Sequence, residues 1–435
     1  MPRVLLLMST RTYRARAFLD AARRLGVEVV VGSERRQALA GQVRDTTLAL
    51  PFRRPDRAVR RIVRFARAVP LDAVIGVDDD TAVLAALAAA ALGLPHNAPG
   101  AVRAARDKFR LRRALARAGL PGPAFQRWTI ADDPARAAAA APYPCVLKPT
   151  ALAASRGVIR ADSPAEFVAA FQRIAALLAA DGAGHRHILV ESFLPGPEVA
   201  LEGLLVGGRL HVLALFDKPD PLDGPYFEET LYITPSRHPP ALQAAVADNV
   251  ARAAAALGLR EGPVHAELRV GPGGPYVLEI AARSIGGLCS RTLRFGAGIS
   301  LEELILRHAV GLDLSGLLVR ERTAAGVLML PIPRAGILYG VQGEDAARQV
   351  PGIEGLEITI PLGQPVVPLP EGDRYLGFLF ARGDTPAAVE AALREAHGHL
   401  RFLIAPPGAP PEEADALVAG PARLALPVVG APRAG

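Results

Sequence analysis

The sequence predicts a mixed fold class, with an α/β region first and α+β regions after it. In the first hundred residues, apolar strand-like runs such as "RVLLLM" and "VEVVVG" alternate with helical stretches such as "ARAFLDAARRLG". This βαβα order is typical of a parallel sheet covered by helices. Later in the chain, hairpin-like pairs of strands lie between helices, which favours an α+β organisation.

The length of 435 residues exceeds that of one ordinary domain, so two or three domains are expected. We expect an N-terminal α/β domain over residues 1–100, a central domain over residues 101–315 and a small C-terminal α+β domain over residues 320–405. Residues 406–435 are rich in Pro, Ala and Gly and are expected to form a flexible tail.

The expected elements of the later regions follow in order along the chain. A helix begins near Ala101, runs through "RDKFRLRRALARAGLPGP" and closes at Gly119 and Pro121, which typically end helices. Then come the strand "CVLKP", the helix "SPAEFVAAFQRIAALLAA" and the strands "HILVESFL", "EVALEGLLVGG" and "RLHVLALFDKP". Beyond the helix "SLEELILRHAVG", the C-terminal region contains strands such as "AGVLMLPIP" and "RYLGFLFARG" and the helix "PAAVEAALREAHGHL".

Composition excludes several classes of protein. Only two cysteines, Cys145 and Cys289, occur, which argues against a disulfide scaffold or a Cys-rich zinc site and favours the cytoplasm. The apolar stretch from Ala82 to Pro95 is too short to span a bilayer, so no membrane segment is expected. The net charge of +7 comes from scattered arginines on helix-like segments, and solvated helix faces explain them better than a nucleic-acid groove.

Three motifs carry charged residues in unusual places. Lys108 begins a helix in "ARDKFR" and Lys148 ends a strand in "CVLKPT", where both could hold an anion, although ordinary surface lysines are the alternative. In "VESFLPGPEV", Glu191 ends one strand and Glu198 begins the next, a pattern that an exposed turn also produces.

The third motif is "VHAELRVGPGGPYVLEIAARSIGG", two strand-like runs that each contain one acid among apolar neighbours. Pairing these strands would bring Glu267 and Glu279 onto one face, where the carboxylates would repel unless a cation intervenes. Mg²⁺ is the natural cation because it prefers oxygen ligands, and a solvated strand face is the alternative. Arg283 follows, and the pair Gly286 and Gly287 would let the backbone approach a substrate.

The order of these motifs resembles the ATP-grasp superfamily of carboxylate-amine ligases over roughly Ala101 to Gly311. The usual phosphate-binding loops, GxxxxGK[ST] and GxGxxG after a strand, are absent from the sequence. The resemblance implies an ATP-grasp fold that binds ATP and Mg²⁺, or Mn²⁺ in its place. The ending "EIAARSIGGLCSRTLRFGAGISLEELILRHAVG" and the small C-terminal domain are similar to the L-amino-acid ligase group, which joins amino acids into dipeptides.

The resemblance also implies residue roles. Lys108 and Lys148 would contact the phosphates, with Lys148 also near the adenine, Glu191 and the backbone at Phe193 would contact the adenine, and Glu198 the ribose. Glu267 and Glu279 would hold the metal, and Arg283 would be catalytic. Ser155 and Gly157 belong to the loop expected to cover ATP. The substrate cleft is expected to involve Asp217, Lys218, Glu228, Glu229, Gly286 and Gly287, with a solvated loop as the alternative for the four charged residues.

Two departures from the family pattern stand out. The loop "PTALAASRGVIR" has one glycine where the family has several, and Ala281 stands where many members have an asparagine that binds metal. His265 is expected on the strand face opposite Glu267 in a structural role, and Cys289 as a buried structural thiol.

The implied function is an ATP-dependent ligase that joins a small-molecule carboxylate to an amine through an acyl phosphate, with no nucleic-acid partner. An ATP-grasp carboxylase, a formyl-transfer ligase and a non-catalytic nucleotide-binding protein with a degenerate metal site are the alternatives. A homodimer is a possible assembly on base rates alone.

Overall fold

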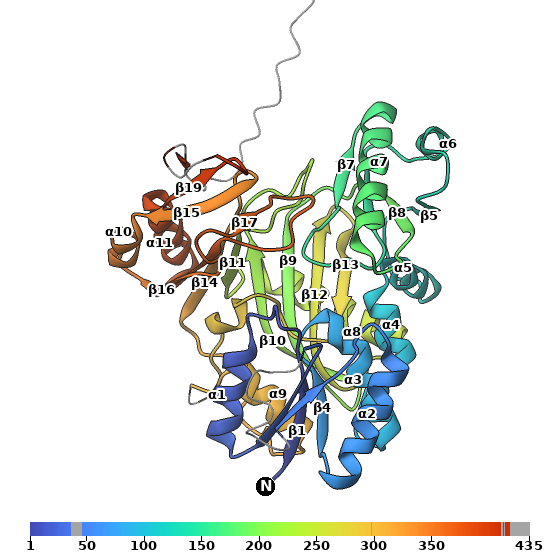
Figure 1. The fold of residues 1–435 in the computed structure, drawn as a ribbon, viewed down its shortest axis with the longest axis vertical. Coiled ribbons are helices and arrows are strands. Elements are labelled where there is room, and N and C mark those ends of the chain that lie inside the picture. The colour runs from blue at the N-terminus through green and yellow to red at the C-terminus, as the bar shows by residue number, and fades with distance from the viewer. Residues whose placement is uncertain (36–45, 297, 410–411, 413, 418–435) are drawn as a thin grey trace, which may run out of the picture.

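The described residues among the first hundred form a parallel four-stranded sheet covered by helices, as the βαβα order predicts (Figure 1). The computed structural model describes residues 1–35, 46–296, 298–409, 412 and 414–417. The sheet has the strand order β3-β2-β1-β4. Its strands are β1 (Arg3–Leu7), β2 (Glu28–Ser33), β3 (Thr47–Ala49) and β4 (Ala73–Gly76), and its helices are α1 (Ala15–Leu25), α2 (Pro55–Ala68) and α3 (Asp79–Leu92).

Two helices stand where the sequence predicts one, which corrects that prediction. The helices α4 (Pro99–Arg106) and α5 (Lys108–Arg117) are separated at Asp107, whose backbone is extended at φ −100° and ψ 108°. The Asp107 side chain accepts a hydrogen bond from the backbone N–H of Arg110 at 3.0 Å. A carboxylate that satisfies a first-turn N–H starts a new helix. The break therefore makes Lys108 the first residue of α5.

A small antiparallel sheet with the order β5-β8-β6-β7 follows, covered by the longer of two helices. Its elements are β5 (Phe125–Thr129), α6 (Pro134–Ala139), β6 (Cys145–Pro149), β7 (Ile159–Ala161), α7 (Pro164–Asp181) and β8 (His187–Ser192). Phe167, Phe171 and Ile174 of α7 recur at helical spacing and are buried in the same apolar core as Leu147 and Val190. This packing holds β6 and β8 side by side.

The large sheet has eight antiparallel strands in the order β13-β12-β9-β10-β11-β14-β18-β16. Its strands are β9 (Glu198–Val206), β10 (Arg209–Lys218), β11 (Leu231–Thr234), β12 (Gly262–Gly271), β13 (Gly274–Ala281), β14 (Ala324–Leu330), β16 (Ile353–Ile358) and β18 (Gly377–Gly383). With it belong α8 (Pro240–Leu257), α9 (Leu301–Ala309) and the 3-10 helix η1 (Cys289–Thr292).

The C-terminal region contributes to two sheets. Strands β14, β16 and β18 extend the large sheet through the pairing of β11 with β14, so the expected limit between residues 315 and 320 separates segments that share one sheet. A second sheet has the order β17-β15-β19-β20. Its strands are β15 (Gly336–Gln342), β17 (Pro365–Val366), β19 (Arg401–Ala405) and β20 (Asp415–Leu417), and the helices are α10 (Glu344–Gln349) and α11 (Pro386–His399). The domain limits stay a prediction, and most of the expected tail lies outside the described residues.

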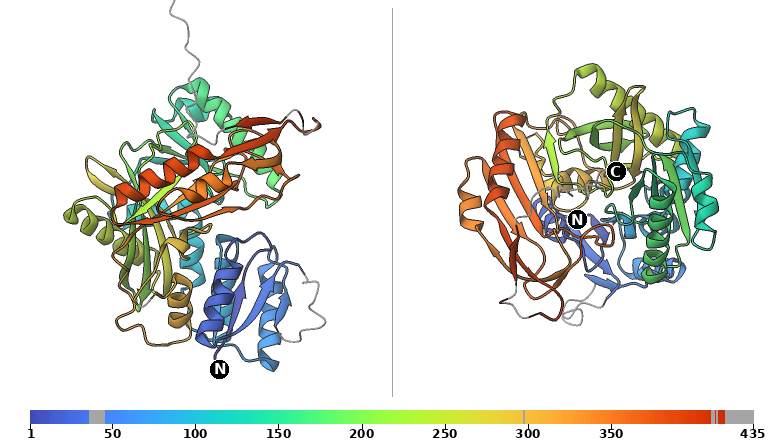
Figure 2. Two further views of the ribbon diagram at one scale, coloured as in Figure 1. Left: turned by 90° about the vertical axis from the view of Figure 1, so that its left-hand side faces the viewer. Right: turned by 90° about the horizontal axis from the view of Figure 1, so that it is seen from above.

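The N-terminal sheet packs beneath the large sheet. Phe18 of α1, Phe216 of β10 and Phe295 belong to one buried apolar core. Figure 2 shows the N-terminal region, in blue, against the lower end of the large sheet, with the small sheet and the C-terminal region above it on opposite sides. No helix in the described part of the chain has the length and apolar character needed to cross a membrane.

Candidate active site

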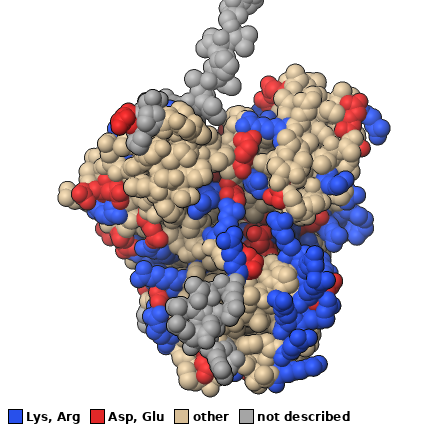
Figure 3. Space-filling model, viewed as in Figure 1, with Lys and Arg blue, Asp and Glu red and all other residues tan. Residues whose placement is uncertain are grey.

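One cavity of about 270 Å³ lies where the small sheet, the large sheet and the start of α3 meet. In Figure 3, acidic side chains gather in the hollow at the middle of the face shown, with basic side chains around it. The residues expected from the sequence that line this cavity are Lys108, Lys148, Ser155, Glu191, Phe193, Glu198, Glu229, Glu267, Glu279, Arg283, Gly286 and Gly287.

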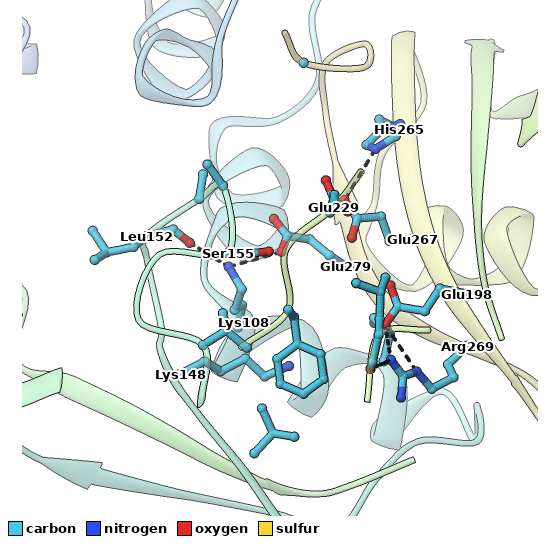
Figure 4. A pocket seen from close by; sticks show the side chains of 18 of the residues that line it. Lys108, Lys148, Leu152, Ser155, Glu198, Glu229, His265, Glu267, Arg269 and Glu279 are labelled. Carbon is cyan, nitrogen blue, oxygen red and sulfur yellow. Dashed lines mark hydrogen bonds and ion pairs between the residues drawn. The ribbon is translucent and has the colours of Figure 1, made fainter. Parts of the chain in front are cut away.

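Lys108 lies beside Glu279 at one side of the cavity (Figure 4). The Lys108 Nζ atom is 3.1 Å from Glu279 Oε2 and donates a hydrogen bond to the carbonyl of Leu152 at 2.7 Å. The backbone N–H of Lys108 donates to the carbonyl of Thr150. The break before α5 therefore directs Lys108 toward both the loop after β6 and an acid of β13.

Glu191 is the centre of a buried ion-pair group. Lys148 Nζ lies 2.5 Å from Glu191 Oε2, and the guanidinium of Arg112 in α5 donates to Glu191 Oε1. Arg112 also donates to the carbonyls of Val277 and Leu278 at 2.9 and 2.8 Å, so it ties α5 to β13. Burial alone would raise the pKa of Glu191, but Arg112 and Lys148 hold it below its ordinary value. Glu191 is therefore ionised and orients Lys148.

The backbone of Phe193 is partly engaged within the protein. Its N–H donates to the carbonyl of Pro144 at 2.9 Å. The ring of Phe193 lies against two guanidinium groups, with the Cζ atoms of Arg160 and Arg269 at 4.2 and 5.0 Å from the ring centroid. An adenine could therefore hydrogen-bond to this backbone by donating to the carbonyl of Phe193.

Lys218 is the centre of an acidic cluster, beneath the cavity rather than in its lining. Its ammonium lies 3.4 Å from Glu198 Oε2, 3.3 Å from Glu267 Oε2, and also pairs with Glu229. Burial lowers its pKa, but these carboxylates outweigh burial and raise the pKa of Lys218 above its ordinary value. Oxygens of the three acids lie within 4.8 Å of one another, a spacing that would also suit a metal ion. Here the Lys218 ammonium is the shared partner of all three acids, and Arg269 adds a second positive charge beside Glu198.

Glu267 and Glu279 face each other on β12 and β13, which confirms the pairing predicted from the sequence. Figure 4 shows both side chains pointing into the same space. The two carboxylates pair with different cations, Glu267 with Lys218, which it shares with Glu198 and Glu229, and Glu279 with Lys108. The two acids can therefore lie close together without a bound ion.

His265 lies on the same face of β12 as Glu267, which corrects the expectation of opposite faces, because residues two apart in a strand share a face. Its Nε2 atom is 3.5 Å from Glu267 Oε1, and its Nδ1 atom is 3.2 Å from Glu202 Oε2. Burial lowers its pKa, but the two carboxylates outweigh burial and raise the pKa of His265 to about 9. His265 is the cross-strand partner of Ala281 and lines the cavity. An imidazole therefore lies beside the alanine that stands where many family members have an asparagine.

Arg283 is held by a residue of the N-terminal region. Its Nε and Nη2 atoms donate to Asp79 Oδ2 at 3.0 and 2.6 Å, and its Nη1 atom donates to the carbonyl of Ser284 at 3.0 Å. Burial lowers its pKa, but Asp79 outweighs burial and raises the pKa of Arg283 above its ordinary value. These bonds use three of the five N–H groups of the guanidinium, which leaves two for a ligand.

The two glycines after Arg283 meet different requirements. A Cβ at Gly286 would meet no atom within 4 Å, so this position borders open space in the cavity wall. Gly287 has a φ of +57°, and a Cβ there would lie 2.9 Å from the ring of Phe378. The backbone turn after Arg283 therefore depends on Gly287.

The loop over residues 150–158 contains left-handed backbone conformations, which glycine usually adopts, although it has one glycine. Ala154 and Ser155 have φ values of 57° and 54°, which are uncommon for residues with a side chain. Gly157 has a φ of 74°, and its N–H donates to the carbonyl of Pro370 at 2.8 Å. Ser155 lines the cavity, whereas Gly157 attaches the loop to the C-terminal region.

Among the described residues, Asp217 and Glu228 do not line the cavity, which corrects their expected place in the substrate cleft. Asp217 pairs with Arg237 at 3.1 Å and accepts a hydrogen bond from Ser236 Oγ at 2.5 Å. Successive residues of a strand face opposite ways, so Asp217 points away from the cluster around Lys218. Glu229 alone of the four charged residues expected there reaches the cavity.

The raised pKa of Glu228 predicts a dependence of stability on pH. Burial raises this pKa from 4.5 to about 7, so the folded protein binds the proton more tightly than the unfolded chain does. Its contribution to stability is complete below about pH 4 and is lost as the pH rises to about 7. Glu228→Gln, which stays neutral, should raise the free energy of unfolding by roughly 3 kcal/mol above pH 7 and leave it unchanged at low pH. Urea unfolding at both pH values measures the difference, and a gain independent of pH would contradict it.

Three family models match the chain. The ATP-grasp domain matches residues 141–292, the ATP-grasp N-terminal domain matches residues 19–96, and L-amino acid ligase C-terminal domain 2 matches residues 328–405. The chain belongs to the ATP-grasp superfamily.

Solved structures agree on the fold of this ATP-grasp protein. An L-amino acid ligase from Bacillus licheniformis matches with a TM-score of 0.77 and 26% sequence identity, over 93% of this chain and 99% of that chain. A biotin carboxylase domain of 2-oxoglutarate carboxylase from Hydrogenobacter thermophilus, solved with MgADP and bicarbonate, matches with a TM-score of 0.66 and 18% identity, over 92% and 90% of the two chains. The second likeness concerns the fold alone.

Curated relatives of this ATP-grasp protein include carnosine synthase 1 of Gallus gallus, which is 31% identical over 74% of this chain and 38% of that protein. Alanine–anticapsin ligase of Bacillus subtilis is 26% identical over 58% of this chain and 56% of that protein. The chain therefore spans less than two thirds of the length of these relatives.

The residues of the cavity fit a nucleoside triphosphate with a divalent cation. Lys108 and Lys148 supply two ammonium groups for phosphate oxygens, and both are buried. Glu267 and Glu279 supply facing carboxylates, which are the oxygen ligands that Mg²⁺ prefers. When phosphates bind, Lys108 would pair with them instead of with Glu279. A divalent cation would then take the place of the Lys108 ammonium beside Glu279.

The sequence holds a further signal for Lys218, which is already among the residues expected at the substrate cleft. The chain has 50 lysines and arginines, of which only Lys108, Lys148 and Lys218 are lysines, and all three are buried here. In a chain whose other basic residues are arginines, a lysine indicates a position that needs a compact ammonium group. No comparable signal points to Arg112 or Arg269, because buried arginines are not distinguished from exposed ones by local pattern.

Proposed function

We propose that this protein is an ATP-dependent carboxylate–amine ligase that forms an amide or dipeptide bond between amino-acid substrates through an acyl phosphate. The observation that carries the proposal is the convergence of Lys108, Lys148, the facing acids Glu267 and Glu279, and Arg283 on one cavity. These are the charges needed to neutralise phosphates and to stabilise an oxyanion.

The reaction has two bond exchanges. A carboxylate oxygen of the first substrate bonds to the γ-phosphorus of ATP while the bond to ADP breaks. The amine nitrogen of the second substrate then bonds to the acyl carbon, and phosphate leaves. One ammonium proton must leave before the attack, and a second departs with phosphate or solvent.

Each residue has a distinct role in this scheme. Lys108 and Lys148 offset the charge of the phosphates, and the two remaining N–H groups of Arg283 stabilise the oxyanion at the acyl carbon. Bound Mg²⁺ or Mn²⁺, held by Glu267 and Glu279, would supply further neutralisation of phosphate charge. Glu198 is assigned to the ribose, and its pairs with Arg269 and Lys218 fix its position.

The names of the relatives support amino-acid substrates. Carnosine synthase, alanine–anticapsin ligase and dapdiamide A synthase share 31%, 26% and 30% identity with the matched parts of this chain. The match of the C-terminal region to L-amino acid ligase C-terminal domain 2 adds independent support. Glu229, Gly286 and Gly287 line the part of the cavity that we assign to the first substrate.

Phosphate release from ATP tests the proposal. The purified protein is incubated with ATP and Mg²⁺ and screened over pairs of amino acids, with each amino acid alone as the control. We expect release that depends on both members of a pair, with the dipeptide detected by mass spectrometry. Bicarbonate- or formate-dependent release would instead support a carboxylase or a formyl-transfer ligase. Nucleotide binding without release under any condition would support a non-catalytic protein.

A further inference from the structure

Three consecutive aspartates at the start of α3 have different surroundings. Asp79 holds Arg283, and Asp80 accepts a hydrogen bond from Arg106 at 2.7 Å near the protein surface. Asp78 is the N-cap residue of α3 and lines the cavity. The N-terminal region thus places two carboxylates, from Asp78 and Asp79, in the wall of the candidate active site.

Asp78 differs from every other acid of the cavity wall in the described part of the chain. Seven carboxylates line the cavity, and six of them have a cationic partner. The six pairs are Asp79 with Arg283, Glu191 with Lys148, Glu198 with Arg269, Glu229 with Lys218, Glu267 with Lys218, and Glu279 with Lys108. Asp78 is the acid of this wall that has no ion-pair partner within the described part of the protein, so a cationic ligand could pair with it.

The Asp78 carboxylate is also incompletely satisfied. Its Oδ2 atom is buried and has no hydrogen-bond partner among the residues that the structure describes. Such an atom costs free energy unless a ligand completes its bonding. The nearby cations Arg14 and Arg283 each pair with another carboxylate, Arg14 with Glu302 at 3.0 Å and Arg283 with Asp79, and in the described part of the chain neither forms an ion pair with Asp78. Burial raises the pKa of Asp78 despite Thr12 and these arginines, which agrees with an incomplete set of partners.

We propose that Asp78 binds the ammonium group of the amine substrate. The proposal rests on the ligase function above and names the substrate class that this wall recognises, a primary ammonium such as the α-ammonium of an amino acid. Asp78 is adjacent in sequence to Asp79, which holds Arg283. The amine is therefore received next to the residue assigned to the acyl carbon, and the N-terminal region selects the second substrate.

The test compares Asp78→Asn with Asp80→Asn as a matched control. Asparagine keeps the N-cap of α3 and the shape of the side chain but removes the charge. For Asp78→Asn we expect the KM for the amine to rise by about 10- to 100-fold, the range for loss of a hydrogen bond to a charged group. The KM values for ATP and for the carboxylate should stay unchanged. Asp80→Asn should match the unmodified protein in all three.

A second nucleophile separates binding of the ammonium from formation of the acyl phosphate. Hydroxylamine is neutral at the assay pH and traps acyl phosphates as hydroxamates without an ammonium group. Asp78→Asn should form hydroxamate at the unmodified rate while it loses amide formation at low amine concentration. An unchanged KM for the amine, or a parallel loss of hydroxamate, would overturn the assignment of Asp78 alone. An unmodified protein that forms neither product would overturn the ligase function, and this assignment with it.

Discussion

Replacing Arg283 with alanine is expected to lower turnover by about 100-fold or more, the usual cost of losing one oxyanion donor. The two N–H groups that Asp79 and Ser284 leave unused are the donors that this variant removes. Nucleotide affinity should change little, because Lys108 and Lys148 remain. Turnover is measured by phosphate release with a saturating amino-acid pair, and nucleotide affinity by calorimetry.

Two further variants sharpen the prediction for Arg283. Arg283→Lys keeps the charge but loses the planar fork that Asp79 orients, so it should also be slow. Arg291→Ala removes an exposed arginine that pairs with Glu357 at 2.6 Å, and it should leave turnover unchanged. A loss that appears only in the KM for ATP would show that Arg283 serves nucleotide binding rather than the oxyanion.

Replacing Lys218 with methionine is expected to lower the free energy of unfolding by about 3–5 kcal/mol. Methionine fills a similar volume but leaves Glu198, Glu229 and Glu267 without the ammonium that they share. Removal of one partner from a buried ion cluster is costly because the remaining charges stay desolvated. Urea unfolding at neutral pH measures the loss.

The cause of that loss can be separated from lost packing. If uncompensated charge is responsible, the loss should shrink at acidic pH, because the three carboxylates become neutral on protonation. A divalent cation should also restore part of the stability of Lys218→Met, since the three acids have oxygens within 4.8 Å of one another. A loss independent of both pH and divalent cations would point to packing instead. Arg348→Met, which removes an exposed pair with Glu344, is the control and should have little effect.

Local pattern was sufficient for the parts of the protein that short-range physics controls. The βαβα order predicts the parallel N-terminal sheet, because crossover helices force neighbouring strands to run parallel. The Gly- and Pro-rich turn between Glu267 and Glu279 predicts a hairpin, and a hairpin pairs its strands directly. Strand alternation could also have predicted that His265 lies on the same face as Glu267, because the two residues are two positions apart in one strand.

Other features depend on which elements pack together, and no local pattern encodes that. Arg283 and Asp79 are 204 residues apart and meet only because the N-terminal sheet packs beneath the large sheet. Arg112 reaches Glu191 because Asp107 starts a new helix, and a single side-chain hydrogen bond decides that break.

The sequence by itself determined the parallel N-terminal sheet, the facing acids of the β12–β13 hairpin, and the strand lysine Lys148. These follow from alternation, turn composition and helix periodicity, which act over a few residues. Only the tertiary structure decided that Lys218 is shared by three acids, that Asp217 points away from them, and that Asp78 has no ion-pair partner among the residues that the structure describes. The physical reason is that charges act through space over several ångströms, so their partners depend on strand order and domain packing rather than on neighbours in the chain.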